Sequence, residues 1–198
     1  MAAYPNNKNF THMKKLFILM ALMASLCSRA ADLRLAGGSL DWLKDMKLLT
    51  AEFDCSKAKW NNNRDWEEYV ARARRVDDWE LKSMEYFYEW FNDEIITITA
   101  RTANDKVRYK AVVQITNVDN GGRITANILL VDIPSGKTMA TFIFWSTDGD
   151  SEDHITMRDP MKELGECMGK AFRKYLKTGK AKKWKEGSNN SADNTYSW

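Results

Sequence analysis

Residues 135–138 (SGKT) have the types and order found at the end of a phosphate-binding loop, where backbone N–H groups and a lysine bind the phosphates of a nucleotide. A complete loop has its first glycine five residues before the second, and Val131 occupies that position. The next residues, 137–145 (KTMATFIFW), are β-branched and aromatic and predict a strand where a nucleotide site requires a helix. We therefore interpret residues 134–136 (PSG) as a three-residue hairpin loop with a bulge, and we expect no nucleotide cofactor.

A second candidate for chemistry is the loop over residues 146–154, whose carboxylates could bind a hard cation. The candidate metal ligands are Asp148, Asp150, Glu152 and Asp153. An EF-hand loop alternates Asp or Asn ligands ahead of a glycine and has a Glu six residues after it, and this order is missing. We interpret the segment as a solvated acidic loop, and we predict no metal site and no cofactor.

The sequence contains no recognisable catalytic motif. A G-x-S-x-G elbow is missing, and His154 is the only histidine in residues 31–198, so a Ser-His-Asp triad is not predicted. Carboxylates are plentiful, but the pairing that glycoside hydrolysis requires is a geometric property that the sequence does not reveal. We predict no catalytic residues and keep a small periplasmic hydrolase that uses acidic residues as the alternative hypothesis.

Residues 13–30 (MKKLFILMALMASLCSRA) have the three parts of a secretory signal peptide. Two lysines start the segment, residues 16–26 are apolar, and a small-x-small site predicts cleavage between Ala30 and Ala31. The apolar part has 11 residues, well short of the roughly 20 that span a bilayer. We therefore predict an exported protein of the periplasm or cell envelope, with residues 1–30 as an N-terminal extension and cleavable signal.

Cys27 raises the alternative of lipid attachment, because the signals of bacterial lipoproteins are cleaved just before a lipid-modified cysteine. Such signals have a small residue directly before the cysteine and a leucine three residues before it. Leu26 and Ala24 occupy these positions here, so a soluble exported protein is favoured. Association with a membrane surface stays open, and a spanning segment is not expected.

Removal of residues 1–30 changes the charge balance of the chain. The full sequence has 30 basic and 27 acidic residues, and the removed part holds four basic residues and no acidic one. Eight of the remaining basic residues lie between positions 170 and 185, so an acidic body has a basic end. This distribution does not predict nucleic-acid binding, which requires a basic face with stacking aromatic side chains. We predict instead that Lys174 and Lys177 contact a protein or surface component of the envelope.

The patterns predict one α+β domain over residues 31–180 and a polar, disordered tail over residues 181–198. The expected fold is an antiparallel, or else mixed, sheet of four to five strands with helices packed on one face. The strands are expected near residues 46–55, 94–102, 106–118, 123–133 and 137–145. The helices are expected after Asp65, over 77–93 and over 159–178. The sequence DNGG at 119–122 predicts a hairpin with a type I′ turn.

The middle helix has apolar and aromatic residues on two sides. The expected core stripe is Leu81, Met84, Tyr88 and Phe91. A second stripe, about 140° away, consists of Trp79, Tyr86 and Trp90. Either loops or the preceding short helix cover these three rings, or the rings form a partner-binding patch.

The last helix has the clearest signals. Asp159 is the expected cap, Pro160 the first helical residue, and Gly165 and Gly169 allow close packing on the sheet. The expected core stripe of this helix is Met161, Leu164, Met168, Phe172 and Tyr175. Cys55 and Cys167 are either two free thiols or a disulfide, and their spacing does not decide between these alternatives.

Several segments carry a resemblance that covers most of residues 31–180. They are residues 38–40 (GSL) with 43–44 (LK), 51–60 (AEFDCSKAKW), 89–95 (EWFNDEI) and 161–177 (MKELGECMGKAFRKYLK). The order of these segments along the chain is similar to that in a group of small exported proteins of unknown function from Bacteroidetes. More distantly, the sheet and closing helix resemble envelope lipoprotein domains related to the curli secretion channel, whose central turn matches Asp132, Ser135 and Gly136.

The resemblance implies helices on a mixed sheet and an interaction or assembly role in the envelope, without known catalytic residues. Together with the export signal, it predicts a non-catalytic binding or assembly module. The predicted contact residues are Trp79, Tyr86, Trp90, Lys174 and Lys177.

Overall fold

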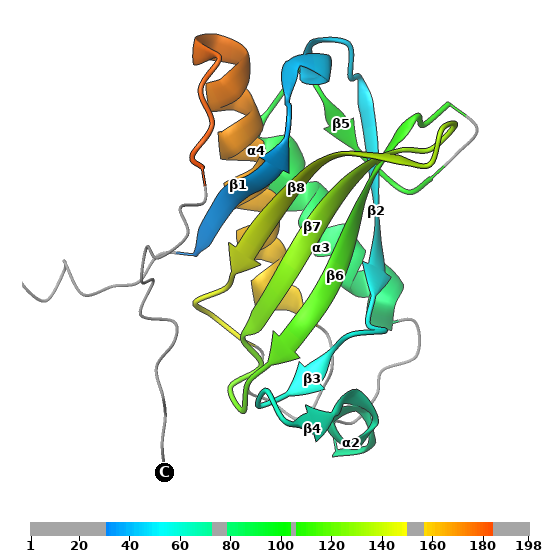
Figure 1. Ribbon diagram of the computed structural model, residues 1–198, viewed down its shortest axis with the longest axis vertical. Helices are drawn as coiled ribbons and strands as arrows, with labels where there is room; N and C mark the ends of the chain where they lie inside the picture. Colours follow the sequence, from blue (N-terminus) through cyan, green and yellow to red (C-terminus); the bar gives the residue numbers. More distant parts are fainter. Residues whose placement is uncertain (1–30, 73–78, 104–105, 150–156, 184–198) are drawn as a thin grey trace, which may run out of the picture. The chain divides into compact units, whose positions relative to one another are not determined.

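The structure is a computed structural model that describes residues 31–72, 79–103, 106–149 and 157–183. The described residues all belong to one compact unit. An open sheet carries the two long helices on one of its faces (Figure 1). The strands are β1 (Asp32–Gly38), β2 (Leu48–Asp54), β3 (Lys59–Trp60), β4 (Arg64–Asp65), β5 (Thr99–Ala100), β6 (Tyr109–Val118), β7 (Ile124–Asp132) and β8 (Lys137–Trp145). The helices are the short 3-10 helix η1 (Asp41–Lys44), α2 (Trp66–Arg72), α3 (Trp79–Glu94) and α4 (Arg158–Thr178).

The sheet has the strand order β1-β8-β7-β6-β2-β5, and β3 pairs with both β4 and β6. Strands β6, β7, β8 and β1 form an antiparallel series, while β2 runs parallel to β6 and β5. The predicted α+β class is confirmed, but eight strands replace the expected four to five, and the sheet is mixed. The parallel pairing arises because α3 lies between β2 and β6, and a helical crossover returns the chain to the same end of the sheet.

Strand β1 was not expected from the sequence. It is an edge strand that pairs with β8, and its two buried side chains, Leu33 and Leu35, are the only alternating signal in a segment that ends in two glycines. After α4 the chain returns to the free edge of β1, where the Leu35 N–H donates to the Lys182 carbonyl oxygen at 2.8 Å. The Lys182 ammonium lies 2.5 Å from the Asp32 carboxylate. The first and last described residues of the domain are therefore joined side by side.

The expected strand over residues 94–102 is only two residues long. The Ile95 N–H still donates to the Phe91 carbonyl oxygen, so helical hydrogen bonding continues past the expected end of α3. The Asn92 side chain then donates to the Ala100 carbonyl and accepts from the Ala100 N–H, which fixes β5 beside the helix. The loop between α3 and β5 is therefore held at both ends.

The core lies between the sheet and the two long helices. The inner face of β6, β7 and β8 contributes the fully buried Val113, Ile115, Ala126, Ile128, Leu130, Phe142 and Phe144. Helix α4 buries four of the five residues of its predicted stripe, and Tyr175 is half-buried. In helix α3 the predicted Met84 and Phe91 are buried, but Ser83 and Phe87 are buried as well and Leu81 is 50% exposed, so the buried face is turned from the predicted stripe. The face of α3 that is buried is the one that α4 contacts.

The two glycines of α4 pack against α3, and not against the sheet as expected. A Cβ atom at Gly165 would lie 2.7 Å from the Phe87 carbonyl oxygen and 2.9 Å from the Phe91 nitrogen. A Cβ atom at Gly169 would lie 2.6 Å from the Cβ atom of Glu94. The two helices therefore approach closely because neither position carries a side chain.

Both hairpin turns differ from the predicted types. In the turn between β6 and β7 only Gly122 has a positive φ, of 75°, and the Asp119 carboxylate accepts hydrogen bonds from the N–H groups of Gly121 and Arg123. A type I′ turn would need two positive φ angles, so the turn is of another type. The loop between β7 and β8 has four residues, 133–136, and Gly136 has a φ of 65°.

Helix α4 begins before its predicted cap. Met157, with a φ of 44°, precedes the first helical residue, and its carbonyl accepts a hydrogen bond from the Met161 N–H at 3.0 Å. Asp159 is therefore inside the first turn, and Pro160 is the third helical residue and not the first. Proline is tolerated there because the first four N–H groups of a helix have no partner within the helix.

The Asp132 carboxylate holds the loop between β7 and β8. Because its pKa differs from the ordinary value, we expect the free energy of unfolding to depend on pH. Hydrogen bonds from the Ser135 hydroxyl and the Arg108 guanidinium lower the pKa of this carboxyl below its ordinary value of 3.8. A lowered pKa in the folded state stabilises the protein above pH 3.8, and this contribution is lost as the pH falls towards the folded-state pKa.

We expect Asp132→Asn to lower the free energy of unfolding at neutral pH, and the difference from the parent protein to shrink below pH 3.8. Urea unfolding across this range measures the effect. If the unfolding midpoints of the two proteins fall by the same amount as the pH is lowered, the lowered pKa does not belong to Asp132.

Candidate binding surface at the basic end of helix α4

The three rings of the predicted aromatic stripe do not form one exposed surface. Trp79 is only 4% exposed, and its ring centroid lies 5.2 Å from that of Phe53 and 6.2 Å from that of Trp66. Helix α2 therefore covers Trp79. For this ring the structure agrees with the alternative in which the preceding short helix provides the cover. Tyr86 and Trp90 are half-buried, and the Lys162 ammonium lies 4.1 Å from the centre of the Trp90 ring.

The acidic loop is described only in part. Asp150, Glu152 and Asp153 lie outside the described residues. The N–H groups of Thr147 and Asp148 both donate to the Glu163 carboxylate, which attaches the start of the loop to α4. Among the residues that the structure describes, no group of three or more His, Cys, Asp or Glu side chains is placed to hold a metal ion.

The titratable groups with clear pKa shifts do not resemble a general acid and a nucleophile. Hydrogen bonds from Ser39 and Tyr175 lower the pKa of Asp41, and hydrogen bonds from Gln114 and Ser56 lower the pKa of Asp54. Burial alone would raise the pKa of Asp32, but Lys182 and Arg34 together lower it. A carboxyl that acts as a general acid near neutral pH needs the opposite shift.

Cys55 and Cys167 are free thiols. Burial raises the pKa of Cys55 to about 12 and that of Cys167 to about 11. Both groups therefore stay protonated near neutral pH, and neither has the depressed pKa of a reactive cysteine.

The described residues form a groove of about 260 Å³ at the end of the domain where η1, the end of α4 and the loop between α3 and β5 meet. It is lined by Leu43, Lys44, Met46, Lys47, Thr97 and Leu176. Backbone and side-chain hydrogen bonds hold these segments together. The Tyr175 hydroxyl donates to Asp41 at 2.7 Å, and the Thr99 N–H donates to the Lys47 carbonyl at 2.9 Å.

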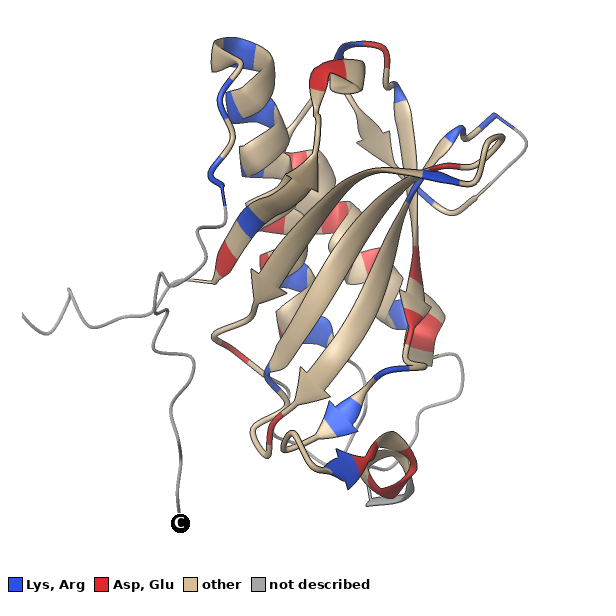
Figure 2. Cartoon of the chain, in the orientation of Figure 1, with Lys and Arg blue, Asp and Glu red and all other residues tan. Residues whose placement is uncertain are grey.

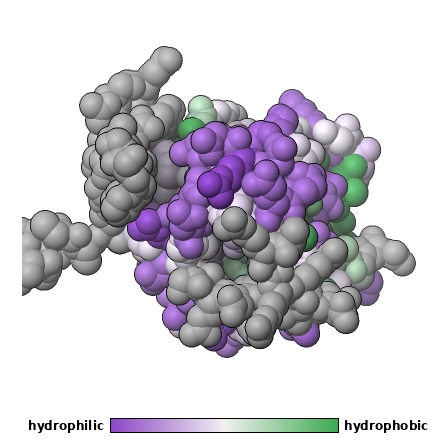
Figure 3. All heavy atoms as spheres, turned by 90° about the horizontal axis from the view of Figure 1, so that it is seen from below, coloured by the Kyte–Doolittle hydropathy of each residue, from purple (hydrophilic) through white to green (hydrophobic). Residues whose placement is uncertain are grey.

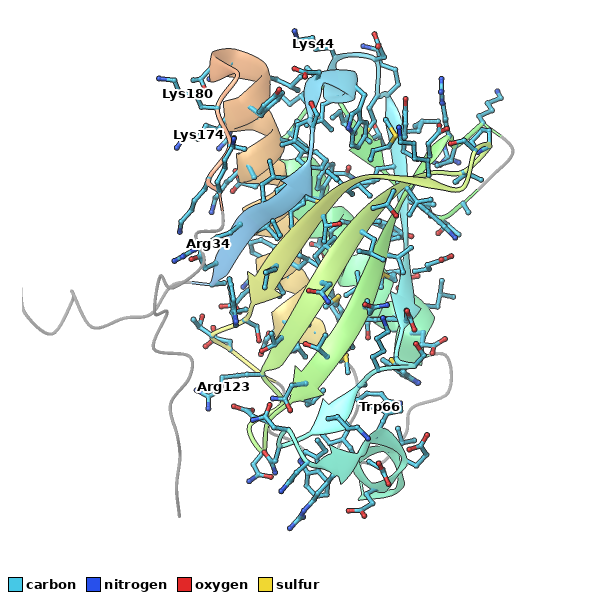
Figure 4. All side chains as sticks on the ribbon, in the orientation of Figure 1. Arg34, Lys44, Trp66, Arg123, Lys174 and Lys180 are labelled. Atoms are coloured by element: carbon cyan, nitrogen blue, oxygen red, sulfur yellow. The ribbon has the colours of Figure 1, made fainter. Side chains whose placement is uncertain are left out.

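Five lysines surround this groove or the helix end beside it: Lys44, Lys47, Lys174, Lys177 and Lys180. Figure 4 shows Lys44, Lys174 and Lys180 at the same end of the domain, and Figure 2 shows the basic residues along the last turns of α4. Within the described ranges none of the five makes an ion pair, whereas the neighbouring Arg173 pairs with Glu94 at 2.8 Å. We call these five lysines and the groove the basic end.

The lysines of α4 differ in direction. Leu176 lines the groove, and Lys180 follows the end of the helix, which stops at Thr178 before Gly179 takes a φ of 65°. Lys177 is about 100° around the helix from Leu176, and Lys174 is about 200° away and faces outward. Of the two lysines predicted from the sequence, Lys177 is thus the nearer to the groove. The exposed Asp45 and Asp93 also lie near this end and reduce its excess of positive charge.

Ile96 is the most exposed large apolar residue among the described residues, at 96%. It precedes Thr97 of the groove, and its flanking residues Ile95 and Ile98 are 3% and 1% exposed. These two buried side chains anchor the loop, so Ile96 projects from a fixed backbone. The coloured residues at the opposite end of the domain, seen in Figure 3, are mostly hydrophilic.

Sequence reasoning did not find Ile96, Lys44 or Lys47 as site residues, whereas Lys180 lies within the basic segment from Lys174 to Lys183 that the sequence predicted for partner contact. The run IITI at 95–98 was interpreted as part of a strand, in which Ile96 would alternate with buried neighbours. Lys44 and Lys47 are distant in sequence from α4, and only the contact between Tyr175 and Asp41 reveals that they share a surface.

No family model and no curated protein matches the chain. Two solved structures of a PelC dodecamer from Paraburkholderia phytofirmans resemble it, one of them a single-substitution variant. The variant is 11% identical with a TM-score of 0.36, covering 68% of this chain and 97% of the PelC chain. The other is 12% identical with a TM-score of 0.35, covering 67% and 97%. Likeness at this level supports no functional assignment. In the described part of the chain, no helix is both long and apolar enough to cross a membrane.

Proposed function

We propose that the chain is an exported, non-catalytic binding or assembly module of the cell envelope, and that it contacts an anionic partner through the basic end. The export signal in residues 13–30 supports the location. The observation that supports the contact is a groove bordered by Lys44 and Lys47, which make no ion pair within the described residues. An excess of positive charge attracts an anionic partner and guides its approach.

The lining of the groove favours binding over catalysis. Its six residues are apolar, hydroxyl or lysine side chains, and they include no carboxylate, histidine or cysteine. General acid–base catalysis needs two groups of matched pKa within reach of a substrate. The hydrolase alternative needs two carboxylates that face one pocket, and the groove offers none.

Site-specific photo-cross-linking in exporting cells tests the proposed contact. A photo-reactive amino acid in place of Lys44 or Lys180 should form a covalent adduct with an envelope component, because both positions lie at the basic end. The matched control is Lys82, an exposed lysine near the start of α3, which should give no adduct. A Lys44→Glu, Lys47→Glu double variant should reduce the adduct formed at Lys180. Equal adducts at Lys82 and Lys180, or none at Lys44 and Lys180, would refute the proposed contact.

A further inference from the structure

We infer that the anionic partner of the basic end is a membrane surface that contains anionic lipid headgroups, and that Ile96 inserts into this surface while the lysines bind the headgroups. This inference rests on the proposed function and specifies its partner. It follows from the shape of the apolar surface, from the direction of the charges and from the rigidity of the loop that carries Ile96.

The first step compares the apolar surface that a partner could remove from water. Ile96 offers such surface, whereas the walls of the groove offer little. Leu43 and Met46 are each 1% exposed and Leu176 is half-buried, so a peptide placed in the groove would remove little further apolar surface from water there. Ile96 is 96% exposed, and it points out of the domain. A rigid protein partner would need a pocket that matches this protrusion, whereas a fluid lipid layer accepts it without one.

The second step is the arrangement of charge around Ile96. Thr97 shares the groove with Lys44 and Lys47. On the other side, the Arg173 guanidinium donates to the Glu94 carbonyl at 2.8 Å, only two residues before Ile96. Lysine side chains have long apolar stems that can lie along an acyl surface while the ammonium groups contact lipid phosphates. The apolar Ile96 side chain can therefore enter the acyl layer while the lysine ammonium groups contact the lipid headgroups.

The third step is the low cost of ordering the contact. The Asn92 side chain binds both backbone groups of Ala100, and Ile95 and Ile98 are buried on either side of the tip. The backbone of the loop is thus already fixed before contact. Insertion of Ile96 loses little backbone freedom, which favours binding by a small number of residues.

Vesicle co-sedimentation of the chain from Ala31 to Trp198 tests the inference. We expect binding to vesicles of phosphatidylcholine mixed with phosphatidylglycerol, little binding to pure phosphatidylcholine, and loss of binding at high salt. Ile96→Asp should weaken binding by about tenfold or more, because an apolar side chain is replaced by a charge. A Lys44→Ala, Lys47→Ala double variant should weaken it by about 25-fold.

Leu81→Asp is the matched control, because Leu81 is 50% exposed and lies near the start of α3, about 22 Å along the helix axis from the loop that carries Ile96. It should leave vesicle binding unchanged. Thermal melting of each variant checks that it is folded, and Ile96→Trp, which retains the apolar tip, should bind at least as well as the parent protein.

Two results would overturn the inference. One is no binding to the anionic vesicles, and the other is binding that Ile96→Asp and Leu81→Asp affect equally. If the chain binds poly-glutamate but not vesicles, the basic end serves an acidic protein. In that case the photo-cross-links at Lys44 and Lys180 persist, and the proposed function stands without this inference.

Discussion

Phe172→Ala is expected to lower the free energy of unfolding by about 3–5 kcal/mol. Phe172 on α4 is fully buried, and its ring centroid lies 5.8 Å from that of Phe91 on α3 and 6.3 Å from that of Phe142 on β8. Removal of the ring therefore leaves a cavity where both long helices and the sheet meet. Because domains of this kind are stable by about 5–15 kcal/mol, the variant should lose a large share of its stability.

Urea denaturation of the chain from Ala31 to Trp198 measures the loss. Leu81→Ala is the control, because the side chain is half-exposed on the outer side of α3. Its expected effect is about 0.5 kcal/mol or less. Equal losses for the two variants would mean that Phe172 does not join the three elements as the structure has it.

Gly165→Ala is expected to destabilise the protein by up to about 2 kcal/mol. Two effects oppose each other, because alanine favours a helix by about 1 kcal/mol over glycine, whereas overpacking costs about 1–3 kcal/mol. The new Cβ would lie 2.7 Å from the Phe87 carbonyl oxygen and 2.9 Å from the Phe91 nitrogen. Both are backbone atoms of α3, which cannot rotate away as a side-chain end could, so the steric cost should prevail.

A glycine that has room for a Cβ atom serves as the control for the steric cost. A Cβ atom at Gly37 meets nothing within 4 Å, so Gly37→Ala should change stability little or raise it slightly. Melting temperatures of both variants decide the matter. If Gly165→Ala melts at or above the temperature of the parent protein, α3 and α4 are not as close as described.

The parts of the fold that the sequence predicts are those with local signals. Helix α4 has apolar residues at three-to-four spacing, and its buried stripe is confirmed by Met161, Leu164 and Phe172. Strands β6 to β8 alternate in hydropathy and are joined by short turns, so their antiparallel pairing follows from adjacency in the chain. The predicted signal in residues 1–30 and residues 184–198 of the predicted tail lie outside the described residues, and their roles stay predictions. The first residues of the predicted tail, 181–183, lie beside β1.

The remaining features depend on contacts between distant residues. The pairing of β1 with β8 joins residues more than a hundred positions apart, and no local pattern in residues 32–38 specifies it. The face that α3 buries is set by Gly165 of α4, so a hydrophobic stripe read from α3 alone assigned Leu81 to the core. The basic end was predicted only for α4, because Lys44, Lys47 and Ile96 reach it from separate elements.

The hydrogen bond between Leu35 and Lys182, and the ion pair between Lys182 and Asp32, have a consequence for attachment. The points where the chain enters and leaves the domain are neighbours. An anchor or a fusion partner at either terminus would therefore be attached to the same side of the domain. Domains with adjoining ends also tolerate circular permutation, in which these ends are linked and the chain is opened elsewhere.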